Sequence, residues 1–101
     1  MRGYNLKSIY LILLAMGLVR SKRQFSREWL LRGWSYLREF DQRDRDEVRV
    51  PAKTVAVLRA RLRAVARLTP GGVRTDLEQV IAVIDRDTHV ADLLSYGRNR
   101  Q

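Results

Sequence analysis

The sequence predicts a compact all-α domain of five to six helices. Apolar residues recur at helical spacing in several separate segments, and capping residues, prolines and glycines lie between these segments. The chain has 101 residues and an apolar content of 46%, which is enough for one modest core. We therefore expect a single helical domain over residues 1–101.

The first helix is expected over about Leu6 to Met16. Asn5 is a candidate N-cap, and Gly17 accepts the left-handed backbone with which many helices end. The apolar run 9–19 is about half as long as a membrane span requires. No small-x-small cleavage site follows it, so we expect a buried helix and not a secretory signal.

Two short helices with a tight turn between them come next. Ser21 and Gln24 form an S-x-x-Q capping box, which predicts a helix over about 22–30. The turn is expected at 32–33, and a further helix from about 34 or 35 to 40. Their inner faces are expected to hold Phe25, Trp29, Leu37 and Phe40, with Tyr36 either joining them or lying at the surface.

A basic amphipathic helix is expected over about 51–68. Residues 42–50 alternate in charge and predict a loop, after which Pro51 suits a first helical turn. The helix has no acidic residue, so its exposed face either meets a polyanion or is simply solvated. Its apolar stripe comprises Val55, Leu58, Leu62, Val65 and either Ala66 or Leu68.

The last helices are expected over about 75–96. Thr75 and Glu78 form a second capping box, and Gly97 marks the end. The charged run 85–88 can interrupt this region, which is why five or six helices are expected.

Charge is distributed unevenly along the chain. The net charge is +9, and residues 75–101 hold three basic and five acidic residues, so the positive field belongs to the first three quarters. Such a field attracts polyanions. Seventeen of the twenty basic residues are arginine, whose fork suits phosphate and guanine edges. A GC-rich genome explains the high ratio of arginine to lysine equally well, but it does not explain the uneven distribution of charge along the chain.

Residues for catalysis or metal binding are scarce. There is no cysteine and a single histidine, His89, and we find no phosphate-binding glycine loop or nucleophile elbow. The carboxylates between residues 41 and 47 alternate with arginines, which favours local salt bridges over a metal site. We expect no enzyme, no metal and no cofactor.

The segment from about Leu6 to Phe40 resembles the helix-turn-helix domains of phage-repressor-like bacterial regulators. Phe25 and Trp29 match the inner face of the first helix of the pair, and Ser26 matches the small residue where the helices touch. The chain is also similar to short bacterial proteins with an S-x-x-x-F-S-x-x-W-L signal, here residues 21–30.

The turn departs from the pattern of these regulators. Their usual turn glycine is replaced by Leu30. In these regulators the second helix of the pair has two inward-facing apolar residues, and the corresponding positions here are Tyr36 and Glu39. In this chain the apolar residues come one position later, at Leu37 and Phe40. We therefore expect a turn that is one residue longer than usual.

The resemblance implies a recognition helix that enters the major groove of DNA. The residues implied to contact bases are Trp34, Ser35, Tyr36, Arg38 and Gln42, with Trp34 either a contact or part of the core. The residues implied to contact the DNA backbone are Lys22, Arg23, Arg27 and Arg32, extended by Arg59, Arg63 and Arg67 on the basic helix.

The resemblance further implies a homodimeric transcriptional repressor that reads an inverted repeat in the bacterial cytoplasm, associated with the nucleoid. Two alternatives remain open: a protein-interaction module such as an antitoxin or antiactivator, and a non-specific nucleic-acid-binding protein. A dimer or partner face is expected at Leu77, Ile81, Ile84, Val90 and Leu94. Alternatively, these residues close the core of the monomer.

Overall fold

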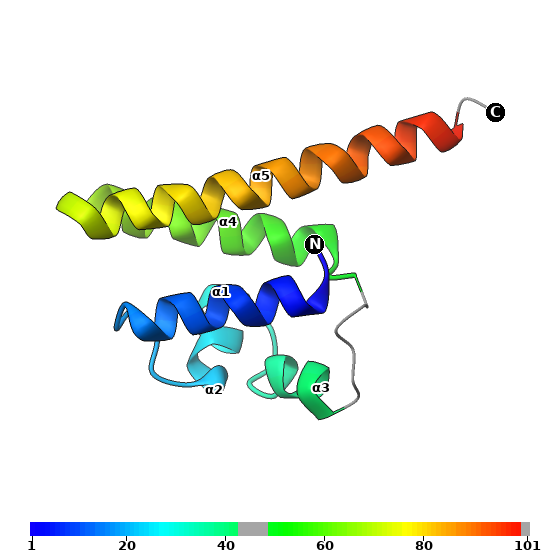
Figure 1. Cartoon of the computed structure of the whole chain (residues 1–101). Coiled ribbons are helices and arrows are strands. Elements are labelled where there is room, and N and C mark those ends of the chain that lie inside the picture. Colours follow the sequence, from blue (N-terminus) through cyan, green and yellow to red (C-terminus); the bar gives the residue numbers. More distant parts are fainter. Residues whose placement is uncertain (43–48, 100–101) are drawn as a thin grey trace.

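The computed structural model describes residues 1–42 and 49–99, with the backbone alone for residues 40–42 and 88–99. It confirms the predicted class, a small all-α domain (Figure 1). An isolated antiparallel bridge joins Arg2 to Arg49. The helical elements are α1 (Gly3–Ala15), α2 (Lys22–Gln24), the π-helix η1 (Phe25–Trp29), α3 (Tyr36–Gln42), α4 (Ala52–Leu68) and α5 (Gly71–Asn99).

The helices α4 and α5 form an antiparallel hairpin, and α1 lies beside it (Figure 1). The elements α2, η1 and α3 pack together on the side away from α5 (Figure 1). With 29 residues, α5 is about 43 Å long, which accounts for the longest dimension of the molecule, 46 Å. Its last turns extend past the start of α4, since the two helices run in opposite directions (Figure 1).

The start of α1 differs from the expectation and its end agrees with it. The helix begins at Gly3 and not at Leu6, so Asn5 is not the N-cap. The Val50 amide donates to the Met1 carbonyl at 2.8 Å, which ties the chain start to the segment before α4. At the other end Gly17 has φ +78°, and the amide of Leu18 donates to the carbonyl of Leu13 at 3.0 Å, as in a Schellman motif.

The helix α4 begins after Pro51, as predicted. Of the two alternatives for the end of its apolar stripe, Ala66 is buried and Leu68 is 86% exposed. The stripe joins one continuous core with α1, α5 and the helix pair, by which we mean the helix formed by α2 and η1 together with α3. The fully buried side chains of this core include Leu6, Leu13, Phe25, Leu30, Leu37, Leu58, Leu62, Leu77 and Ile84.

The helix α5 was predicted with the wrong bounds. It begins at Gly71, where φ is +72°, so the Thr75 capping box is not formed, and Glu78 pairs instead with Arg74 at 3.2 Å. It also continues without a break through residues 85–88. The charged run stays helical because its carboxylates have distant partners, Arg59 for Asp85 and the N-terminal amine for Asp87 at 3.3 Å, while the apolar stripe of α5 packs on the core.

A substitution of Gly17 by alanine is expected to lower the free energy of unfolding by about 1–2 kcal/mol, because the left-handed backbone crowds a Cβ atom. Urea unfolding measures this. The control is Gly72→Ala, within α5, where φ is not positive and there is also free space for a Cβ atom. That variant is expected to gain up to about 1 kcal/mol. Equal effects at both positions would contradict the backbone argument.

Candidate nucleic-acid interface

The helix formed by α2 and η1 starts with a reciprocal cap. The Gln24 amide donates to the hydroxyl oxygen of Ser21 at 3.1 Å, and the Gln24 side-chain oxygen accepts from the Arg20 amide at 2.7 Å. The predicted capping box is therefore confirmed, except that Gln24 reaches one residue further back than the motif requires.

Ser26 connects this helix to α3. Its side chain is fully buried, its hydroxyl donates to the Lys22 carbonyl at 2.8 Å, and its oxygen accepts from the Leu37 amide at 3.1 Å. Phe25 and Leu37 are also fully buried, and the ring of Tyr10 in α1 lies 5.6 Å from that of Phe25. The small residue expected at the helix contact thus also fixes the position of α3 by a hydrogen bond.

The π-helix η1 takes up the additional residue that the sequence pattern indicated. Its closing bond runs from the Leu30 amide to the Phe25 carbonyl at 3.2 Å, five residues apart instead of four. The left-handed residue of the turn is Leu31, with φ 52°, and not Gly33. As a result Leu37 is in the core and Tyr36 is only partly buried.

The start of α3 is open to solvent. Trp34 is 51% exposed, so of its two predicted roles the surface position is the observed one, and Arg38 is exposed as well. Ser35 and Tyr36 are half-buried. Gln42 belongs to α3, but its side chain lies outside the described part of the structure.

Arginines stack on these aromatic rings. The guanidinium of Arg23 lies 4.8 Å from the ring centre of Trp34, and that of Arg32 lies 5.0 Å from the ring of Tyr36. Arg23 and Arg32 were predicted to contact the DNA backbone. The structure places them against the rings of Trp34 and Tyr36, which were predicted to contact bases. A stacked guanidinium is held in one plane while its N–H groups stay free to bind phosphate. Arg27 is exposed and Lys22 half-buried on the same helix.

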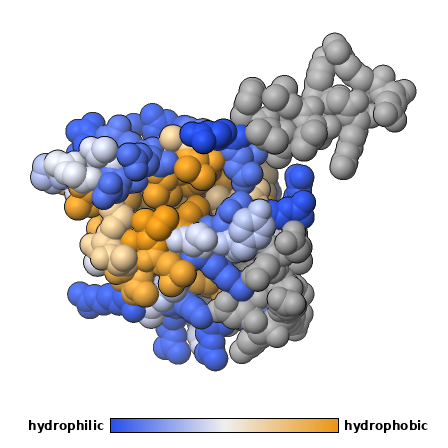
Figure 2. Space-filling view, viewed as in Figure 1, coloured by the Kyte–Doolittle hydropathy of each residue, from blue (hydrophilic) through white to orange (hydrophobic). Residues whose placement is uncertain are grey.

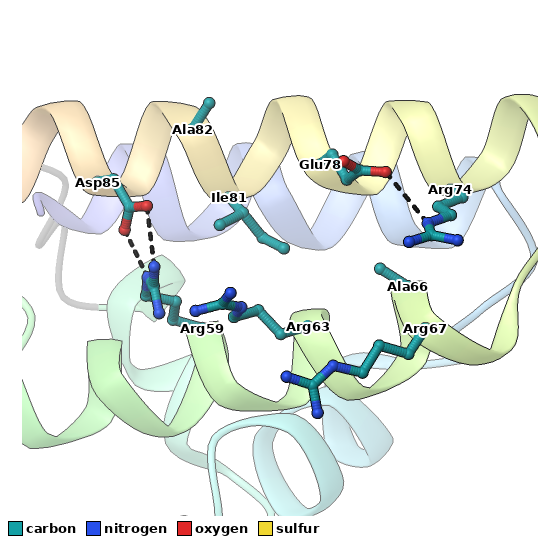
Figure 3. A pocket seen from close by; sticks show the side chains of 9 residues that line it. All are labelled: Arg59, Arg63, Ala66, Arg67, Arg74, Glu78, Ile81, Ala82 and Asp85. Atoms are coloured by element: carbon teal, nitrogen blue, oxygen red, sulfur yellow. Dashed lines mark hydrogen bonds and ion pairs between the residues drawn. The ribbon is translucent and has the colours of Figure 1, made fainter.

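The three predicted backbone contacts of α4 lie elsewhere, along α5 (Figure 3). Arg59 donates to both carboxylate oxygens of Asp85, with Nη2–Oδ2 at 3.0 Å. These hydrogen bonds lower the pKa of Asp85 and raise that of Arg59. Arg59 is thus occupied by a carboxylate, whereas Arg63 and Arg67 are exposed.

Sequence reasoning did not assign a role to Arg61. Its guanidinium lies 5.4 Å from the ring centre of Trp29, so it connects α4 to η1. The pairing joins positions 32 residues apart, and nothing in the local sequence indicates it.

The candidates for a dimer face occupy different environments. Leu77 and Ile84 are 0% and 1% exposed within the monomer, so they close its core and offer no free surface to a second copy. Ile81 is half-buried and lines the α4–α5 groove. The side chains of Val90 and Leu94 lie outside the described part of the structure.

A second groove, between α1 and α5, was not predicted. It has a volume of about 510 Å³, and it belongs to an exposed apolar surface (Figure 2). Ile12 and Val83, which line it, are 42% and 57% exposed. The available sequence signal was the length of the apolar run 9–19, which holds more apolar residues than one buried face of a helix needs.

Within residues 1–42 and 49–99, no helix is both long and apolar enough to cross a membrane. Among the residues described there is also no group of three or more potential metal ligands. The acidic residues between 43 and 48, for which salt bridges were predicted, lie outside the described residues.

Residues 6–89 match a family of unknown function (DUF6626), and the chain belongs to this family. The match covers most of α1, all of α2, η1, α3 and α4, and most of α5. No curated protein and no solved structure matches the chain.

Replacing Ser26 by alanine is expected to lower the free energy of unfolding by about 1–3 kcal/mol, because the buried Leu37 amide loses its acceptor. The matched control is Ser8→Ala. The Ser8 hydroxyl also donates to a carbonyl four residues earlier, but it is exposed, and it accepts no hydrogen bond from another helix among the described residues. Urea unfolding compares the two, and equal losses would contradict a role of Ser26 between the helices.

The Arg59–Asp85 pair is expected to make stability depend on pH. Because the folded-state pKa of Asp85 is lowered, the pair stabilises the fold above the ordinary value of 3.8, and this is lost as the pH falls through the folded-state pKa. Asp85→Asn should therefore lower the urea midpoint at pH 7, and the difference from the wild type should vanish in strong acid. The control is Asp76→Asn on the same helix. A difference that persisted in acid would contradict the pairing.

Proposed function

We propose that this protein is a sequence-specific, double-stranded DNA-binding regulator, a homodimer that represses transcription by occupying an inverted repeat. The observation that carries the proposal is the hydrogen bond between Ser26 and Leu37, which holds α3 against η1 with Trp34 and Arg38 exposed. That is the geometry a helix-turn-helix needs, with one helix bracing the other for insertion into the major groove.

The charge of the helix pair supports DNA as the ligand. Residues 20–38 contain six basic residues and one acidic residue. Arg23 and Arg32, which lie over the rings of Trp34 and Tyr36, and the exposed Arg27 would bind phosphates. Arg38 would then pair with guanine, and Trp34 would contact a thymine methyl group or a sugar.

A second candidate function is a protein-interaction module, such as an antitoxin or antiactivator. The observation that favours it is the apolar groove between α1 and α5, with Ile12 and Val83 exposed. Isolated exposed apolar residues are normal, but a continuous apolar groove is typical of a surface that binds another protein. In this case the positive charge would serve solubility only.

The deciding experiment selects duplexes from a random pool at about 150 mM salt, the physiological screening regime. We expect a short inverted repeat. Arg38→Ala should relax one position in each half-site and cost about 1–3 kcal/mol there. Arg27→Ala should instead weaken the binding of all sequences equally. It should also lower the salt slope, the slope of log affinity against log salt concentration, by about 1.

Each other outcome has a definite meaning. Binding without an enriched sequence would contradict a base-reading α3 and indicate non-specific nucleic-acid binding. No binding to any duplex would contradict the whole proposal and favour the protein-interaction module. Equal behaviour of the Arg38 and Arg27 variants would contradict the separate roles given to α3 and α2.

A further inference from the structure

The groove between α4 and α5 is lined by arginines from both helices (Figure 3). Its volume is about 320 Å³. Arg63 points into the space between the helices, and Arg74 reaches from α5 toward Ala66 (Figure 3). Arg67 lies at the edge of the groove on α4 (Figure 3). Arginines therefore line both walls, but the excess of positive charge belongs to the α4 wall, because Glu78 and Asp85 lie beside Arg74 on α5.

Only part of this charge is neutralised. Arg59 is paired with Asp85 near one end of the groove, and Arg74 with Glu78 near the other. Glu78 and Asp85 are the two carboxylates among the described lining residues, against four arginines, so two positive charges remain. Arg63 and Arg67 make no hydrogen bond or close ion pair with any residue that the structure describes, and the charge of Arg63 contributes only at longer range, as the last of the causes that lower the pKa of Asp85.

The spacing of the unpaired arginines suits an extended polyanion. Arg63 and Arg67 are four residues apart on α4, which places them about 6 Å apart along one face. The floor contributes Ala66 and Ile81, whose side chains offer no competing hydrogen-bonding group (Figure 3). Guanidinium groups bind phosphate by two parallel N–H donors, which a nearby apolar floor strengthens.

We propose that the α4–α5 groove is a phosphate-binding site, in which Arg63 and Arg67 bind phosphate groups from α4 and Arg74 binds them from α5. The phosphates belong either to a nucleic-acid backbone or to a free polyphosphate, which present the same chemistry. Arg63 and Arg67 were among the predicted DNA-backbone contacts, and the proposal adds Arg74 of α5 and a ligand, free polyphosphate, that the proposed function does not include. Because the site is separate from α2, η1 and α3, it stands even if α3 reads no bases.

The first test measures the binding of inorganic tripolyphosphate by calorimetry. Arg63→Gln/Arg67→Gln should lower the affinity about tenfold for each arginine removed, since each loses charge-assisted hydrogen bonds. The control, Lys53→Gln/Arg86→Gln, removes the same charge from exposed positions on α4 and α5 outside the groove and should change little. An equal loss in both double variants, or no loss in either, would overturn the site.

A gain of affinity is the sharper test. Glu78→Gln frees Arg74 from its ion pair, and the affinity for tripolyphosphate should rise about two- to fivefold, the range expected for an exposed pair. Damage to the fold cannot produce such a gain. An unchanged or lower affinity would overturn the part of the proposal that assigns Arg74 to the ligand.

A fluorescent duplex of arbitrary sequence identifies the source of the phosphates. If tripolyphosphate displaces the duplex, and Arg63→Gln/Arg67→Gln lowers its salt slope by about 2, the groove binds a nucleic-acid backbone. If only the tripolyphosphate affinity falls, the ligand is a free polyphosphate. If neither probe is affected, the site is overturned, while the sequence selection with Arg38→Ala still decides the proposed function independently.

Discussion

The structure of the helix pair depends on the side chain of Ser26. A buried hydroxyl must have its hydrogen bonds satisfied, and this one does so by donating within its own helix and accepting from the Leu37 amide. An amide at the start of a helix has no partner within that helix, so Ser26 supplies what α3 lacks. Ser26 thereby sets the position of α3, and with it the set of side chains that α3 exposes.

The register of the pair was predictable only in part, because the sequence left open whether Tyr36 or Leu37 lies in the core, and the way the register is achieved was not predictable. The apolar pattern indicates Leu37 in place of Tyr36, and it implies one additional residue before α3. It does not reveal where that residue is accommodated, because Phe25 and Trp29 are spaced alike for an α-helix or a π-helix. The chain places it in η1, and Leu31 then adopts a left-handed conformation that is costly for a residue with a Cβ atom.

The bounds of α5 show where local sequence rules stop being informative. Capping residues and charged runs predict helix ends only if no distant contact outweighs them. Here Arg59 binds Asp85 from 26 residues away, and Leu77 and Ile84 are fully enclosed by the core. For the same reason, two apolar residues that were candidates for a dimer face belong to the core of the monomer. The composition of α5 predicts an apolar stripe, but it does not indicate which neighbouring element covers that stripe.

The two grooves lie on opposite sides of α5. At 3.6 residues per turn, Glu78, Ile81 and Asp85 share one face, whereas Gln79 and Val83 of the apolar groove lie on the far side. The core stripe lies between these two faces. A polyanion bound along the arginines would therefore leave the α1–α5 groove uncovered. This separation makes the two proposed kinds of binding compatible, because a nucleic acid bound on one side of α5 would leave the other side open to a protein.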